Sequence, residues 1–355
     1  MKILVLRFSS IGDIVLTTPV VRALAQQVPG AEVHFATKPG YRGLLEPNPY
    51  ISKVHCLTGR LGELIQELKA ERFDHIIDLH NNLRTRLIKL RLGVQSSSFD
   101  KLNWQKWLLV NLKIDRLPRV HIVQRYLVAA APLGVNDDGR GLDYFIPEGQ
   151  EVDLATLPAP FQRGGYVAVA IGAQHATKRL PVEQLIALCA SLAPRPIILL
   201  GGPEDEGIGH IIEEAFATRA AVAQPPATIP DSPYYFPENA PFRAVNQPLI
   251  VNGCGQYSLH QSASLLRQAT FVVSHDTGLM HIAAAFGKQI FSVWGNTVPA
   301  FGMYPYQTEF RVLEVAGLSC RPCSKIGFDK CPQGHFKCMR EQNLNLDLPP
   351  LRDGR

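Results

Sequence analysis

The sequence lacks the segments that export a protein or anchor it in a bilayer. The first apolar run, Ile3 to Leu6, is shorter than the hydrophobic part of a signal peptide, and no small-residue cleavage site follows it. No stretch approaches the roughly 20 apolar residues that cross a membrane. We therefore expect a cytoplasmic protein that meets the inner membrane face, if at all, only peripherally.

Strong net charge is also missing. Thirty-six Lys and Arg residues stand against 31 Asp and Glu, a net charge of +5. This mild excess fits an acidic substrate or an anionic surface better than dedicated nucleic-acid binding, so no nucleic-acid partner is expected. The G-x-G-x-x-G fingerprint is absent from the first strand–helix turn, where Gly12 stands alone. Its absence argues against an NAD-dependent oxidoreductase, which stays a disfavoured alternative.

What the chain does contain is a repeated alternation of apolar strands and helical patterns. Its 355 residues predict two domains, and the alternation predicts an α/β fold with parallel, doubly wound sheets. A stretch rich in Pro, Gly and Ala at 148–165 predicts the linker. The expected strands are Lys2–Leu6, Val33–Ala36, Lys53–Leu57, His75–Leu79, Tyr166–Ile171, Pro196–Leu200, Leu249–Asn252, Thr270–Ser274 and Gln289–Trp294.

One segment interrupts this pattern. Seven prolines fall between 223 and 248. A loop of this length inside a compact domain is either functional or partly disordered, and both interpretations stay open.

The strongest local signal is a polar turn, His275 to Gly278, between a buried strand and a helix rich in small residues. Free backbone N–H groups at the start of a helix, aided by the positive end of its dipole, form an anion site. Gly278 allows close backbone approach, Thr277 offers a hydroxyl, and His281 lies in the first turn. The alternative is an ordinary Asp or Thr cap, with Asp276 as the acid.

Two more polar segments follow strands of the same half. Lys178 and Arg179 precede a helix that Pro181 can start, where they would compensate phosphate charge or else be solvated loop cations. Glu204 and Asp205 follow a glycine pair. An acid there can bind a ribose hydroxyl, and Asp205 can equally cap the next helix.

The first half offers Asp13 and a second polar cluster. Asp13 lies where the first strand meets the first helix, and it can accept a proton from an attacking hydroxyl if that end faces the other domain. The alternative is a carboxylate favoured by the helix dipole. The second cluster, 78–85, closes another buried strand and contains His80 and Arg84.

A basic segment follows this cluster. From Arg84 to Arg125 there are ten Lys or Arg residues and two acids, with Trp104 and Trp107 among the lysines. Such a stretch can meet an anionic acceptor or lie on a membrane surface. A solvated helical face with its tryptophans packed inward is the alternative.

Four cysteines cluster near the end of the chain, with the spacing C-x2-C-x7-C-x6-C. They are Cys320, Cys323, Cys331 and Cys338. Four thiols at short spacings can bind a structural zinc, but this spacing departs from the paired C-x2-C pattern, so reduced or locally bridged thiols are the alternative.

Taken in order, five motifs resemble the lipopolysaccharide heptosyltransferases. They are the turn 9–13, the strand end 78–80, the loop 177–181, the glycine turn 201–204 and the donor turn 275–281. The resemblance spans nearly the whole chain. It implies a GT-B architecture, in which two Rossmann-like domains face each other across a cleft. It also implies an inverting transfer from an ADP-heptose, without a covalent sugar intermediate, to a lipopolysaccharide-core or related glycolipid acceptor.

The resemblance also implies roles for individual residues. Asp13 matches the family's base and Lys178 its phosphate-binding lysine. The expected donor contacts are Lys178, Thr177, Glu204, Asp276, Thr277, Gly278 and His281. The expected acceptor contacts are Ser10, Gly12, His80 and Arg84. We expect no catalytic metal and no cofactor, because a cation and a helix N-terminus already face the phosphates.

The resemblance also divides the chain. The expected division is an acceptor domain over 1–155, a donor domain over 156–335 and a tail over 336–355. Two departures concern the sugar more than the reaction: the 223–248 insertion, and Leu180 where many members have Trp. A non-catalytic homologue that only binds a nucleotide sugar stays an alternative.

Overall fold

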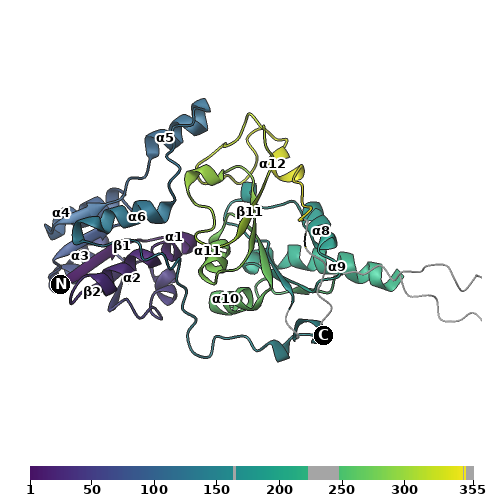
Figure 1. The fold of residues 1–355 in the computed structure, drawn as a ribbon, viewed down its shortest axis with the longest axis horizontal. Helices are drawn as coiled ribbons and strands as arrows, with labels where there is room; N and C mark the ends of the chain where they lie inside the picture. The colour runs from purple at the N-terminus through teal and green to yellow at the C-terminus, as the bar shows by residue number, and fades with distance from the viewer. Residues whose placement is uncertain (163–164, 223–247, 347, 349–355) are drawn as a thin grey trace, which may run out of the picture.

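The computed structural model describes residues 1–162, 165–222, 248–346 and 348. The chain forms two α/β halves, each built around its own parallel sheet, that lie side by side (Figure 1). The proline-rich segment 223–248 lies, except for Pro248, outside the described residues. No helix in the described ranges is long and apolar enough to cross a bilayer.

The first half has a five-stranded sheet in the order β3-β2-β1-β4-β5, with every neighbouring pair parallel. Its strands are β1 Lys2–Leu6, β2 Glu32–Thr37, β3 Lys53–Cys56, β4 His75–Asp78 and β5 Ser96–Ser98. Its helices are α1 Ile11–Val15, α2 Thr18–Gln27, η1 Pro39–Leu44, α3 Leu61–Glu71, α4 Leu83–Leu92, α5 Asn103–Trp107, η2 Leu108–Leu112, α6 Ile122–Ala130 and η3 Ala131–Leu133.

The second half has a six-stranded parallel sheet in the order β11-β10-β9-β6-β7-β8. Its strands are β6 Val167–Ala170, β7 Ile197–Leu200, β8 Ile250–Asn252, β9 Phe271–His275, β10 Ile290–Trp294 and β11 Phe310–Glu314. Its helices are η4 Leu154–Thr156, α7 Ala159–Gln162, η5 Ala176–Lys178, α8 Val182–Ser191, η6 Pro203–Asp205, α9 Glu206–Val222, α10 Leu259–Gln268, α11 Gly278–Ala285, η7 Pro299–Phe301 and α12 Lys337–Arg340.

The predicted fold class is confirmed, and each of the nine expected strands is present with ends that differ by no more than one residue. Two strands were missed, β5 and β11. Each lies at the edge of its sheet and exposes most of its residues, so neither carries the continuous apolar run of a buried parallel strand.

A continuous hydrophobic core joins the two halves. Buried side chains of β1 and α2 belong to the same cluster as those of α10 and α11. Helices α1 and α11, which follow the central strands β1 and β9, meet in the middle of the molecule (Figure 1). The described end of the chain packs onto the second half, where Met339, Leu344 and Leu346 are buried. The carboxyl ends of the two central strands therefore meet at the junction, where open α/β sheets bind ligands.

Candidate active site

Two glycines bring the starts of α1 and α11 together. A Cβ atom on Gly12 would lie 2.7 Å from His281 Cδ2 and 3.4 Å from the Cα of Gly278. A Cβ on Gly278 would lie 2.8 Å from Ile11 Cγ2. The distances of 2.7 and 2.8 Å are shorter than carbon contacts normally allow. The two helices can therefore approach this closely only because neither Gly12 nor Gly278 has a side chain. This approach brings the turn that carries Asp13 and the turn 275–278 into one site.

Asp13 is held in the site as a carboxylate. Its Oδ1 lies 2.6 Å from Arg7 Nη2, and its Oδ2 accepts hydrogen bonds from the Ser10 hydroxyl at 2.9 Å and the Ser10 backbone N–H at 3.2 Å. Burial by itself raises the pKa of Asp13, but Arg7 and Ser10 outweigh it, so the net shift is downward. The side chain is still 22% exposed. Asp13 is therefore ionised near neutral pH and reachable from solvent.

Arg7 is the residue that the sequence analysis missed at this site. Its guanidinium donates to the carbonyls of Ser9 at 2.7 Å and Leu79 at 2.5 Å, and to the hydroxyl of Tyr126 at 2.9 Å. These bonds fix the group that orients Asp13. A charged residue at the end of an otherwise apolar, buried strand was the available signal, because a buried cation needs a partner.

Within the described part of the chain, the N-cap residue of α11 makes no side-chain hydrogen bond to the start of the helix. Thr277 occupies the N-cap position with extended backbone angles and makes no side-chain cap. The carboxylate of Asp276 does not cap the helix in its place, because it accepts from Lys178 Nζ at 2.6 Å and from Thr297 Oγ1 at 3.0 Å. The start of this eight-residue helix, beside Gly278, is therefore a candidate anion-binding site.

Lys178 adds a cation to this anion site. Its ammonium also lies 3.3 Å from the backbone carbonyl of Asp276, so two contacts hold it at the turn before α11. The neighbouring Arg179 points elsewhere, with its guanidinium 3.2 Å from Asp205 and 2.6 Å from the carbonyl of Ala173. Of the two loop cations, Lys178 is therefore the one that lies at the turn before α11.

His281 lies between the two halves of the site. Burial lowers its pKa to about 4, although both Asp13 and Asp276 act to raise it. Its Nδ1 is buried and has no hydrogen-bond partner among the described residues. The ring is therefore neutral near pH 7, with one nitrogen able to hydrogen bond to a ligand. The neighbouring His275 has a structural role, since its Nε2 accepts from the backbone N–H of Leu180 at 3.0 Å.

Two other expected donor contacts, Thr177 and Glu204, lie on the same sheet edge in different settings. The Thr177 hydroxyl exchanges hydrogen bonds with the backbone of Phe328, at 2.8 and 3.1 Å. Glu204 is exposed and folds over Gly202. Asp205 is buried and accepts from the Gly202 N–H at 3.0 Å, so of the two acids only Glu204 is exposed.

Two of the expected acceptor residues, His80 and Arg84, contact Phe8, next to Arg7. His80 contacts the Phe8 ring edge-on at 6.0 Å, and Arg84 lies 5.4 Å above it. Burial lowers the pKa of His80 to about 4, so it is neutral near pH 7. Asp78 does not face the site, because it accepts the N–H of His80 and pairs with Lys89 at 3.0 Å.

Two lysines that were not predicted as site residues, Lys101 and Lys106, also interact with Asp13. Burial lowers the pKa of Lys101, and it lowers the pKa of Lys106 to about 8. Asp13 raises both values and Lys325 of the second half lowers both, so all four charges are close enough to interact. Several positive charges therefore lie around Asp13.

The structure places a group of metal-ligand type elsewhere. Among the described residues, His34, His55 and Glu71 have ligand atoms within 4.8 Å of one another. The two rings hydrogen bond to each other at 2.9 Å and to Glu32 and Glu67, while Glu71 pairs with lysines. The hydrogen-bonding atoms of these residues therefore already have protein partners, as those of buried polar residues generally do.

The four C-terminal cysteines form no such group. All four are free thiols, and no three of their sulfur atoms lie within 4.8 Å of one another. The described cysteine region therefore does not show the zinc site that the spacing allowed.

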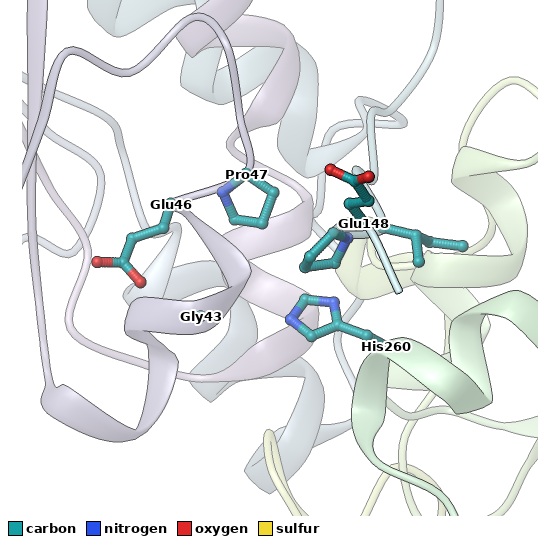
Figure 2. A pocket seen from close by; sticks show the side chains of 7 residues that line it. Gly43, Glu46, Pro47, Glu148 and His260 are labelled. Carbon is teal, nitrogen blue, oxygen red and sulfur yellow. The ribbon is translucent and has the colours of Figure 1, made fainter. Parts of the chain in front are cut away.

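A cavity of about 510 Å³ lies apart from the site, between η1, the linker and α10. Figure 2 shows Glu46, Glu148 and His260 around it. None of the expected site residues lines it. Its two carboxylates disfavour a pyrophosphate, so it is not the candidate donor site.

Comparison with known proteins shows the family and the fold of the chain. The model of glycosyltransferase family 9 (heptosyltransferase) matches residues 61–229 and 238–330. Lipopolysaccharide heptosyltransferase 2 of Escherichia coli is 21% identical over 99% of this chain and 96% of its own length. The structure of E. coli ADP-heptose lps heptosyltransferase II has a TM-score of 0.65 at 21% identity and covers 95% of this chain and 97% of its own. The E. coli heptosyltransferase WaaC with ADP has a TM-score of 0.61 at 21% identity and covers 88% and 93%.

Proposed function

Because the chain belongs to glycosyltransferase family 9, and is thus a glycosyltransferase, we propose that it transfers a heptose or a related sugar from an ADP-sugar. The proposed acceptor is the core of a lipopolysaccharide or a related glycolipid. The observation that carries the proposal is the contact between Gly12 and Gly278, because it sets a carboxylate beside an open helix N-terminus. A base and a leaving-group site are the two parts that an inverting transfer needs.

The donor pyrophosphate binds at the start of α11. Backbone N–H groups from Gly278 onward donate to its oxygens, and Lys178 supplies a positive charge. When the bond between the anomeric carbon and the β-phosphate oxygen breaks, its electron pair goes to ADP. The negative charge that develops on ADP is stabilised by the N–H groups of α11 and by Lys178. Electrostatic catalysis is strongest when such groups are already oriented before the reaction. Thr277, His281 and Glu204 complete the donor contacts, with Glu204 on the nucleoside side.

The acceptor is activated by Asp13. Its carboxylate takes the proton of the acceptor hydroxyl while that oxygen bonds to the anomeric carbon from the face opposite ADP. Arg7 keeps Asp13 ionised and oriented. We assign acceptor binding to residues 1–155, with Ser10, His80 and Arg84 at the site, and donor binding to 156–335.

The transfer as proposed uses no metal and takes place on the cytoplasmic side, with the glycolipid acceptor held at the inner membrane face. A zinc ion at the four cysteines would have to draw the thiols closer than they lie in this structure. Metal analysis of the purified protein tests this point, because one equivalent of bound zinc would establish the site.

The proposed function is tested with Asp13→Asn, which keeps the shape of the side chain and removes its charge. We expect kcat/KM for transfer from ADP-heptose to a core glycolipid to fall by about 10²–10⁴-fold, the typical contribution of a general base. ADP binding should persist, because the donor groups are untouched. Asp74→Asn, at an acid on the far end of the sheet that accepts from Lys2, is the matched control and should leave turnover unchanged.

Two results would contradict the proposal. Near-wild-type turnover by Asp13→Asn would remove the base assignment. A wild-type protein that binds ADP but neither transfers nor hydrolyses the donor would identify the non-catalytic homologue instead.

A further inference from the structure

An arm made of α5 and η2 projects from the first half of the molecule (Figure 1). Its inner face is apolar and reaches the second half, because Leu109 and Leu117 pack with Phe301 of η7 in one buried cluster. Lys113 at the end of the arm donates to the backbone carbonyl of Pro322 at 2.8 Å. These contacts fix the orientation of the arm and determine which of its side chains face outward.

The outer face of the arm carries two exposed tryptophans. Trp104 is 65% exposed and Trp107 is 45% exposed, and their rings stack 5.3 Å apart with only 7° between their planes. Leu112 and Ile114, farther along, are also exposed. The interpretation in which the tryptophans pack inward is therefore wrong. Four large apolar side chains left in solvent on one short arm mark an interaction surface, because single exposed residues are normal but gathered ones are not.

The second half adds to this surface through the loop that follows β11. Ile326 is 61% exposed and Phe328 is 39% exposed on this loop. The loop touches the arm, since Lys113 binds the carbonyls of both Cys320 and Pro322. Both segments lie on the upper side of the molecule in Figure 1. We call the exposed apolar residues of the arm and this loop the apolar rim.

The charges around the apolar rim are mostly positive. The exposed cations at the end of the arm and after it are Lys113, Arg116 and Arg119, against one acid, and the loop 324–330 contains two lysines and one acid. One acid, Asp115, is already paired with Arg119 at 2.7 Å. Trp side chains prefer the headgroup level of a bilayer, and clustered Lys and Arg favour anionic lipids. A protein partner would need acidic and apolar groups in a matching arrangement, whereas an anionic bilayer supplies both over any area.

We propose that the apolar rim docks the protein on an anionic lipid bilayer, with the Trp104–Trp107 pair inserted among the headgroups. The inference deepens the proposed function, because it rests on a glycolipid acceptor. The arm packs on Phe301, whose backbone carbonyl accepts from Arg125 of α6 at 2.9 Å. The next residue of that helix, Tyr126, accepts from Arg7, which pairs with Asp13. Docking through this surface therefore sets the base beside the bilayer, where an acceptor headgroup can reach it while its acyl chains stay in the membrane.

The test compares binding to vesicles of phosphatidylethanolamine with phosphatidylglycerol and to vesicles of phosphatidylcholine alone, by co-sedimentation of the full chain. We expect the wild type to bind the anionic vesicles and to be released by salt. The double variant Trp104→Ser/Trp107→Ser should lose about tenfold or more of this binding, because tryptophans anchor proteins at the headgroup level. The control Val128→Ser/Ile211→Ser removes two exposed apolar residues outside the rim and should bind like the wild type.

Tryptophan fluorescence gives a second readout. The remaining tryptophan, Trp294, is fully buried, so quenching by lipids brominated in their acyl chains reports on Trp104 and Trp107. We expect quenching in the wild type. Ile326→Ser, a single change at an exposed position on the loop, should reduce the amount of protein that sediments with anionic vesicles. This variant tests the proposal if the double variant unfolds.

Activity separates this proposal from the proposed function. The double variant should keep wild-type kcat/KM on a soluble acceptor without acyl chains and lose turnover on acceptor held in anionic vesicles. Equal losses on both acceptors would assign the arm to acceptor binding and overturn docking. Wild-type binding that is equal on neutral vesicles, or that persists in the double variant, would also overturn it. No transfer to either acceptor by the wild type would refute the proposed function while leaving vesicle binding to be judged by sedimentation.

Discussion

Gly12→Ala tests the contact on which the candidate active site depends. The added Cβ would lie 2.7 Å from His281 Cδ2 and 3.4 Å from the Cα of Gly278. Ordinary carbon contacts are about 3.7 Å, so the first distance is short by about 1 Å. His281 is buried and cannot swing into solvent. The variant must therefore move His281, or the start of α1 away from α11, by an amount of this order.

A displacement of about 1 Å between catalytic groups costs roughly 10²-fold in rate, or about 2.7 kcal/mol of transition-state free energy. We expect kcat/KM for transfer from ADP-heptose to fall about 100-fold in Gly12→Ala. Steady-state kinetics measures the loss, and thermal unfolding of the same sample shows whether the variant is folded. The affinity for ADP should change less than kcat/KM, because the substitution leaves Lys178 and the sequence of the turn 275–278 unchanged.

Gly62→Ala is the matched control. Gly62 lies in the first turn of α3, and a Cβ there would meet no atom within 4 Å. Alanine is favoured over glycine in a helix by up to about 1 kcal/mol, so the control should gain slight stability and keep full activity. Gly12 is also helical, and without the clash its alanine variant would behave like the control. A stabilised, fully active Gly12→Ala protein would refute the assigned proximity of Asp13 and the donor turn.

Three further predictions concern the charges of the site. Arg7→Gln removes the cation that lowers the pKa of Asp13 against the effect of burial, so this pKa should rise. The acidic limb of the pH profile of kcat/KM should then move to higher pH. An unchanged limb would show that the ionisation of Asp13 does not control the rate. Because the pKa of Asp13 is lowered in the folded protein, its ion pair with Arg7 stabilises the fold fully above the unfolded-state pKa of about 3.9. This stability should be lost as the pH falls through the folded-state pKa, and urea unfolding at a series of pH values measures the loss. Lys178→Met should lower kcat about 10²–10³-fold in single-turnover transfer, whereas Lys53→Met, at an exposed pair with Glu71, should not.

Much of the fold could be predicted from the sequence for a physical reason. A strand of a parallel sheet is buried on both faces, so it leaves an uninterrupted apolar run that polar or glycine-rich turns end on either side. β1 and β9 are of this kind, and both were placed with ends that differ by no more than one residue. The polar residues that follow them, Asp13 and Asp276 among them, were expected at the ligand-binding edge for the same reason. β5 and β11 have an exposed side and left no such run.

Other features depend on residues that are distant in the sequence. Arg7 binds groups near positions 79 and 126, and no local pattern records that distance. The position of Lys325 is also not recorded locally. It interacts with Lys101 and Lys106 of the first half, although it lies on a loop of the second half. Trp104 and Trp107 were ambiguous in the sequence, since an aromatic pair near lysines is equally compatible with a buried and an exposed face.

The sequence by itself determined the two sheets and the turn that ends each central strand, because periodicity and helix capping are local effects. The tertiary structure alone decided that these turns meet. That meeting depends on how two separately formed halves pack, and its requirement for bare backbone at Gly12 and Gly278 is visible only when both helices are in place. Packing across the junction also left the tryptophans of the arm in solvent, because Leu109 and Leu117 occupy the contact with Phe301.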